Sequence, residues 1–323
     1  MIENKTAFSS FKFLVGGTAI AQAFTILIAP LITRLYTPND FGVFALFNST
    51  LSILVIIASL KYELAIALPK KTKTSISLVF LSLLFIVIFS LITLIFGKII
   101  FNQELRGFNY ILPNAIVYYL PIGIILTASY AVLEFWNNRE KNFRLIAIAK
   151  AQRSIFIGLS QIFLYIINSP SLIISLLIGQ FIALFTLLKG AKLIPLLRYI
   201  NQKDLTKVFK KYSDFPKYFI PGAFINKIGC EIPIFVLSTF FSTSIAGYYA
   251  LAYRVLTLPI SLISNSIANI FYSYASERRR NKAENQSIVI KLVQYQSLII
   301  LPACLFLILN SSFLFELIFG QEW

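Results

Sequence analysis

The feature that most constrains this chain is a series of nine apolar runs, each long enough to cross a lipid bilayer. The hydrocarbon core of a bilayer is about 30 Å thick, and an α-helix needs about 20 apolar residues to span it. Every backbone polar group in hydrocarbon must be paired, which favours helices. We therefore predict an all-α polytopic membrane protein with about nine transmembrane helices. The runs lie at about residues 13–33, 41–60, 76–97, 111–133, 146–167, 171–190, 217–241, 246–272 and 292–315.

The composition supports this prediction. Of the 323 residues, 58% are hydrophobic and 13% are charged, whereas soluble globular proteins carry about 25% charged residues. The N-terminal residues MIENKTAFSSFKF contain no short apolar stretch followed by a small-residue cleavage site. We therefore expect the first apolar run to be kept as a membrane span and not removed as a signal peptide.

Lysine and arginine are distributed unevenly between alternate connections. Of 29 such residues, 24 precede the first run or lie around the connections after the second, fourth, sixth and eighth runs. The other side holds Arg34, Lys98 and Arg106, and Lys227 and Arg254 fall within runs. Because cytoplasmic connections are enriched in these residues, we predict that the N-terminus and the connection after the sixth run are cytoplasmic. Topology and contact with anionic membrane lipids account for most of the net charge of +16, and we expect no nucleic-acid partner.

The residues used by common catalytic and metal sites are scarce. The chain has no histidine, and its 13 carboxylates are scattered. The two cysteines, Cys230 and Cys304, lie in apolar runs, so we interpret them as small buried hydrophobic residues. Zinc, haem and Ser-His-Asp sites cannot be assembled from these residues. We therefore expect no metal, no cofactor and no catalytic residue, and we do not expect an enzyme.

Two short segments recur at nearly the same spacing. FLVG at 13–16 resembles FIPG at 219–222, and GVFAL at 42–46 resembles GYYAL at 247–251, with separations of 206 and 205 residues. The seventh run comes six runs after the first, an even number, so the two repeats would cross the membrane in the same direction. A six-span repeat predicts twelve spans, so the second repeat is expected to be incomplete in this chain.

Three longer segments resemble a known group of membrane proteins. They are PLITRLYTPNDFGVFAL at 30–46, KYELAIALP at 61–69 and AGYYALAYRVLTLPISLISNSIANIFY at 246–272. They are similar to the polysaccharide-exporter branch of the multidrug/oligosaccharidyl-lipid/polysaccharide flippase superfamily, nearest to Wzx-type O-antigen flippases. LIFGQEW at 317–323 resembles a stretch that this family places after its ninth span.

The resemblance implies a MATE-like fold of two six-helix lobes around a central cavity. Residues 1–190 would form a complete first lobe, residues 191–216 a basic cytoplasmic linker, and residues 217–323 the first three helices of a truncated second lobe. The implied substrate is a polyprenyl-pyrophosphate-linked oligosaccharide, flipped across the bacterial cytoplasmic (inner) membrane for O-antigen of lipopolysaccharide or another surface polysaccharide. Other polysaccharide assembly proteins would be partners. With half of the second lobe missing, we expect these residues alone not to transport.

Charged residues within the predicted spans mark the first candidate site. Lys227 and Glu231 lie four residues apart on one face of the seventh span, and Arg254 lies in the antiparallel eighth. An ionised side chain at the bilayer centre costs about 2.5–3.5 kcal/mol on insertion scales, so it normally faces a cavity or a partner. Two cations and one anion would suit a pyrophosphate or an acidic sugar. In the alternative interpretation, a Glu231–Arg254 ion pair only holds two helices together.

Four residues are weaker substrate-binding candidates. Arg34, at the outer end of the first span, would anchor a headgroup or contact substrate. Lys150 and Arg153, at the cytoplasmic mouth of the fifth span, would steer an anionic headgroup or serve topology alone. Asn226 would bind sugar hydroxyls or make a hydrogen bond between helices.

Other functions remain open at this point. A cation-coupled efflux transporter of the same superfamily would favour acidic residues inside the first lobe, but Glu63 and Glu134 lie near cytoplasmic ends. A membrane-embedded polymerase or glycosyltransferase would need paired carboxylates on a large loop, and the longest connection offers Asp204 and Asp214 among eight basic residues. A structural role, with the chain assembling beside another chain, is the third alternative.

Overall fold

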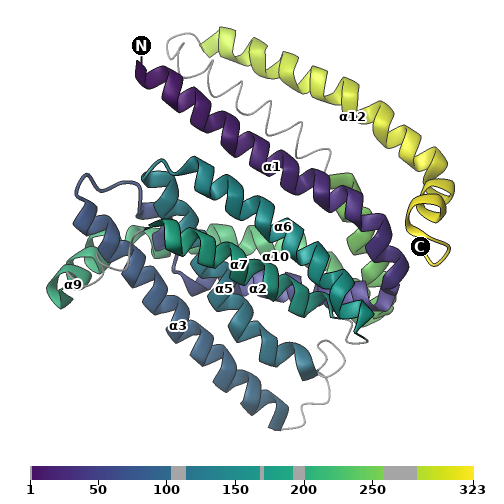
Figure 1. Cartoon of the computed structure of the whole chain (residues 1–323), viewed down its shortest axis with the longest axis horizontal. Helices are drawn as coiled ribbons and strands as arrows, with labels where there is room; N and C mark the ends of the chain where they lie inside the picture. The colour runs from purple at the N-terminus through teal and green to yellow at the C-terminus, as the bar shows by residue number, and fades with distance from the viewer. Residues whose placement is uncertain (1, 103–113, 168–170, 192–200, 258–281) are drawn as a thin grey trace. The chain divides into compact units, whose positions relative to one another are not determined.

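A computed structural model describes residues 2–102, 114–167, 171–191, 201–257 and 282–323 (Figure 1). These residues form helices joined by turns, with no strand among them. By packing, the chain divides into two units, Met1–Gly247 and Tyr248–Trp323.

The first two helices are separated by a short turn whose sequence explains its shape. α1 (Ile2–Leu35) ends just before Thr37, the N-cap of α2 (Pro38–Ala58). The backbone N–H of Thr37 donates to Oδ2 of Asp40 at 3.0 Å, and the N–H of Asp40 donates to Oγ1 of Thr37 at 3.3 Å. These reciprocal bonds satisfy N–H groups that a helix start leaves unpaired, and Pro38 suits the first helical position because it has no N–H.

Four further helices complete the bundle of the first unit: α3 (Thr72–Asn102), α5 (Asn114–Arg139), α6 (Phe143–Ile166) and α7 (Leu172–Ala191). α6 packs between α1 and α7, while α5 packs against α2, α3 and α7 (Figure 1). A short 3₁₀ helix, η1 (Tyr62–Ala65), joins α2 to α3.

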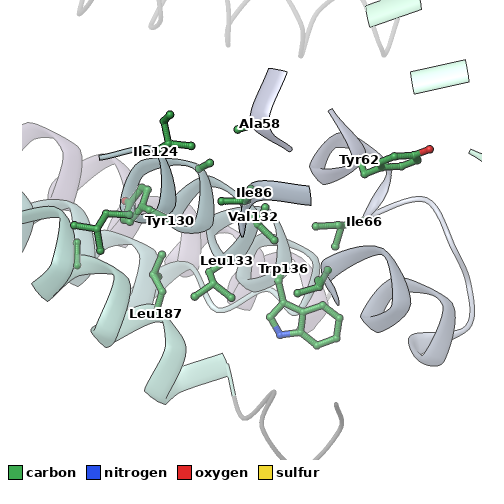
Figure 2. Close-up of a cluster of buried hydrophobic side chains, with 14 of the residues drawn as sticks. Ala58, Tyr62, Ile66, Ile86, Ile124, Tyr130, Val132, Leu133, Trp136 and Leu187 are labelled. Atoms are coloured by element: carbon green, nitrogen blue, oxygen red, sulfur yellow. The ribbon is translucent and has the colours of Figure 1, made fainter. Parts of the chain in front are cut away.

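Large side chains fill the centre of this bundle. Tyr62, Ile86, Leu133, Trp136 and Leu187 come from η1, α3, α5 and α7 and are almost fully buried together (Figure 2). Lipid tails are as apolar as these side chains, so close packing and hydrogen bonds, more than removal from water, hold membrane helices together. The indole N–H of Trp136 accordingly donates to the carbonyl oxygen of Ala191 at 3.4 Å.

After α7 the described chain forms three more helical elements within the first unit. They are α9 (Gln202–Lys211), the π-helical turn η2 (Phe215–Phe219) and α10 (Ile220–Phe240). α9 and part of η2 lie in the predicted basic linker, so part of that linker is an ordered helix. α9 packs on α3, and α10 packs on α2.

Six helical segments among the described residues are long and apolar enough to cross a membrane. They confirm that the chain is an all-α polytopic membrane protein, and the predicted count of nine spans and the two-lobe MATE-like arrangement stay predictions. α6 coincides with the fifth predicted span but carries Lys150 and Arg153 in its length. The six segments are Gly16–Leu35, Pro38–Ala58, Thr72–Lys98, Tyr118–Arg139, Leu172–Ala191 and Phe215–Phe240.

The second unit contains the end of a helix at residues 243–257 and α12 (Lys282–Phe319). The predicted ninth span, 292–315, falls within α12. The predicted eighth span, 246–272, is described up to position 257, and the rest of it lies outside the described residues. Within this unit the rings of Tyr248 and Trp323 meet edge to face, with 5.7 Å between their centroids.

Candidate functional site

The seventh predicted span, α10, carries an ionised pair that faces α2. Nζ of Lys227 lies 2.6 Å from Oε1 of Glu231, one helical turn away. Glu231 is 9% exposed, and its Oε2 accepts a hydrogen bond of 2.6 Å from the hydroxyl of Ser49 on α2. Both bonds are short, as expected when one partner is charged. The sequence prediction that Lys227 and Glu231 share one helix face is therefore confirmed, and the carboxylate is satisfied from two helices.

The contribution of α2 to this network was not anticipated from the sequence. Ser49 donates to Glu231, and the hydroxyl of Ser52, three residues further along the same helix, lies 3.3 Å from Oε1. Serines in membrane helices often donate to a carbonyl of their own helix, as Ser52 also does at 2.9 Å to Ser49. Hydroxyls in an apolar run therefore give no signal that they will reach another helix.

The remaining surface of α10 is largely open. Lys227 retains 35% exposure of its side chain, and Asn226 beside it is exposed. Cys230 is also exposed, so the interpretation of this thiol as a buried hydrophobic residue is wrong. One face of α10 packs on α2, and Cys230 lies away from that contact. The side chain of Cys304 lies outside the described residues.

Arg254, the third member of the predicted site, lies in the second unit on the helix at residues 243–257 and is partly buried. Its proximity to Lys227 and Glu231, and the alternative Glu231–Arg254 ion pair, both stay predictions. What the structure does establish is that Glu231 already has a cationic partner, Lys227, and a hydroxyl donor, Ser49.

Lys150 and Arg153, two of the weaker candidates, lie together on α6 and contact α5. Nζ of Lys150 lies 2.7 Å from Oε1 of Glu134, and the guanidinium of Arg153 lies over the ring of Tyr130, 5.6 Å from its centroid. Tyr130 and Glu134 are one turn apart on α5, as their spacing requires. Both cations are therefore used between helices of the first unit. The fourth candidate of this group, Arg34, is exposed in the last turn of α1.

The start of α2 and the start of the helix at 243–257 approach backbone to backbone. A Cβ on Gly42 would collide with the carbonyl oxygen of Thr243, and one on Gly247 would collide with that of Pro38. Only glycine leaves room for such an approach. Gly42 and Gly247 occupy the same position in the two repeated segments, so the repeat brings two equivalent glycines to one crossing, next to the helix pair that holds Glu231.

Comparison with known proteins assigns the chain to a family. A family model described as "Polysaccharide biosynthesis protein" matches residues 31–323, which include every element from α2 to α12. The chain belongs to the polysaccharide biosynthesis protein family. The resemblance noted from the sequence is therefore confirmed at this level, and the site on α10 is that of a membrane protein of polysaccharide biosynthesis.

One curated relative is the "Teichuronic acid biosynthesis protein TuaB" of Bacillus subtilis (strain 168). It is 22% identical over 117 residues, which cover 35% of this chain and 24% of the relative. The matched stretch therefore spans about a quarter of that relative's length. No solved structure matches the chain.

Proposed function

We propose that the protein is a flippase that translocates a polyprenyl-pyrophosphate-linked oligosaccharide across the bacterial cytoplasmic membrane. The product would enter O-antigen or other surface polysaccharide biosynthesis. The observation that carries the proposal is the Lys227–Glu231 pair in a membrane-spanning helix of a polysaccharide biosynthesis protein. Ionised groups at such positions commonly mark a substrate pathway.

The contacts of Lys227 suit the recognition of a phosphate group. A lysine ammonium has three N–H donors, and Glu231 occupies one of them. Because the side chain is partly exposed, the other donors can reach phosphate oxygens. The serine hydroxyl on α2 helps to hold the carboxylate in place, which orients Lys227 before substrate arrives. Arg254 would add a second cation and leave the site net positive. Translocation requires no covalent chemistry.

The proposal includes an arrangement of the chain in the membrane. Residues 1–190 would form one six-helix lobe, residues 191–216 a basic cytoplasmic linker, and residues 217–323 three helices of the second lobe, with the N-terminus in the cytoplasm. The charge asymmetry of the sequence supports this orientation. Membrane lipids and other polysaccharide assembly proteins would be the partners. The Lys227–Glu231 pair would then lie where the two lobes enclose the cavity.

The test is complementation of a bacterial strain that lacks its own flippase. A form of the protein that carries a complete second lobe is expressed there, and surface glycan and lipid-linked oligosaccharide are both measured. The expected result is more surface glycan and less intermediate in the cytoplasmic leaflet. An intermediate that stays inside while the protein is present in the membrane would refute transport. A change in the mass or length of the intermediate would instead indicate a glycosyltransferase or a polymerase.

A further inference from the structure

A second site in the first unit lies where α9 packs on α3, and it shares no residue with the Lys227–Glu231 pair. A cavity of about 300 Å³ is formed between the beginning of α3 and one face of α9. We call it the α3/α9 pocket. Four of its lining residues are lysines, one is a carboxylate and two are hydroxyl residues. The lining residues are Lys71, Lys73, Thr74, Ser77, Asp204, Lys207, Val208 and Lys211.

The packing of α9 fixes which of its residues face this pocket. Asp204, Lys207, Val208 and Lys211 follow the spacing of a single helix face. Val208 is 4% exposed and belongs to the hydrophobic core, so it fixes which face of α9 packs against the bundle. Next to it, the ring of Phe209 packs against those of Phe85 and Tyr62, which also stack on each other. The lysines are therefore held at the pocket by the same packing that docks the helix.

The charges of the pocket are not balanced. Nζ of Lys73 lies 2.8 Å from Oδ2 of Asp204, and this hydrogen bond holds the pKa of Asp204 below its ordinary value. Within the described part of the chain, no ion pair joins Lys71, Lys207 or Lys211 to a carboxylate. The lining therefore has a net charge of +3, concentrated around one cavity. These lysines are exposed to solvent, so their mutual repulsion is modest, and an anion bound between them would be attracted by all of them.

The location of the pocket points to the chemistry of that anion. The membrane-spanning part of α3 begins at Thr72, so the pocket lies at the end of a span, where lipid headgroup phosphates lie. The first turn of α3 adds the positive end of a helix dipole, which also favours anions. Lysine is a common phosphate ligand because its ammonium acts as a compact point charge.

We propose that the α3/α9 pocket binds a phosphate group, supplied by a lipid headgroup or by a free phosphate compound. Lys71, Lys207 and Lys211 contribute the positive charge, and Asp204 competes with the anion for Lys73. This inference is separate from the proposed transport function, because it concerns binding at α3 and α9 and can be tested without measuring translocation.

Inorganic pyrophosphate is the probe for the first experiment. Its affinity is measured by calorimetry on the full chain in phosphatidylcholine nanodiscs, where the lipid has no net charge. The variant K207Q/K211Q removes two pocket lysines, and K203Q/K210Q removes two exposed lysines of the same helix that do not line the pocket. The pocket variant should bind about tenfold more weakly, whereas the control should change less than about twofold. Asp204→Asn should bind more tightly than the parent protein.

Two results would overturn the proposal. One is the absence of pyrophosphate binding by the unaltered protein at physiological ionic strength. The other is an equal loss of affinity in K207Q/K211Q and K203Q/K210Q, which would indicate diffuse attraction to a basic surface. Both double variants must keep the melting temperature of the unaltered protein, so that a change in affinity does not reflect misfolding. Asp204→Asn is predicted to raise the affinity for pyrophosphate, whereas K207Q/K211Q is predicted to lower it.

A second experiment distinguishes the source of the phosphate. The same titration is repeated in nanodiscs that contain phosphatidylglycerol. If headgroups occupy the pocket, the apparent affinity for pyrophosphate falls by a larger factor in the unaltered protein than in K207Q/K211Q. If it falls equally in both, the pocket takes a free phosphate compound. Either result is consistent with a phosphate site, and the first would place a lipid in it.

Discussion

The hydroxyl of Ser49 lies 2.6 Å from Oε2 of Glu231, although 182 positions separate the two residues in the chain. This bond joins α2 to α10 at Glu231, which is the only carboxylate in α10. Lys227 completes the network by pairing with the same carboxylate. A carboxylate buried among helices must be satisfied in this way because its desolvation is costly. The network therefore couples the charge in α10 to the position of α2.

Removing the hydroxyl should destabilise this helix contact. Ser49→Ala leaves Oε2 of Glu231 without its buried donor. We expect the free energy of unfolding to fall by about 1.5–3 kcal/mol, the usual range for a hydrogen bond to a charged group. Thermal unfolding in detergent measures the effect. Ser82→Ala is the control, because that hydroxyl is also buried and donates to the carbonyl oxygen of Leu78 in its own helix. Equal melting temperatures for the two variants would show that the α2–α10 bond contributes nothing.

Removing either cation of the proposed transport site should lower activity. Under the proposed function, Lys227→Ala and Arg254→Ala should each reduce surface glycan in the flippase-deficient strain. The rate of translocation should fall about tenfold for every 1.4 kcal/mol added to the activation free energy. The amount of protein in the membrane should not change. Lys203→Ala, on the exposed side of α9, is the control. Normal glycan in both site variants would leave helix pairing as the role of these charges.

The close backbone approach at Gly42 and Gly247 should tolerate no added methyl group. Gly42→Ala and Gly247→Ala each place a Cβ against a backbone carbonyl that cannot move like a side chain, and overpacking of this kind costs about 1–3 kcal/mol. Gly229→Ala on α10 has no heavy atom within 4 Å of the new Cβ and serves as the control. Melting temperatures should fall for the first two variants and not for the third. A similar fall in all three would indicate a general effect of removing glycine.

Stability should decline at high pH because of Tyr62. Burial raises the pKa of this phenol above its ordinary value of 10.0. The unfolded chain then releases the proton more readily, so the contribution to stability is complete below pH 10 and is lost as the pH rises through the raised pKa. Tyr62→Phe should weaken this alkaline decline in melting temperature, and the exposed Tyr218→Phe should not. Identical pH profiles would contradict the assignment.

The orientation in the membrane can be tested by reporter fusions. Lys207 lies in α9, on the side that the charge asymmetry predicts to be cytoplasmic, and Ser169 follows an odd number of predicted spans. Fusions at these two positions should report opposite sides of the membrane. Reports from the same side would show that the predicted topology is wrong, whatever the function of the protein.

The sequence by itself determined the features that depend on local chemistry. Membrane spans follow from the transfer of about 20 consecutive residues into hydrocarbon, so hydropathy predicted the fold class. The capping box of Thr37 and Asp40 and the pairing of Lys227 with Glu231 follow from helix geometry over three or four residues. The family resemblance also rests on continuous segments of sequence.

Only the tertiary structure decided which faces of these helices meet. Ser49 reaches Glu231, Lys150 reaches Glu134, and α9 docks on α3 because side chains distant in sequence fit together in space. An apolar run gives no information on which of its faces will be covered, which is why the exposure of Cys230 was predicted wrongly. Close packing selects the covered face, and packing depends on the shapes of both helices.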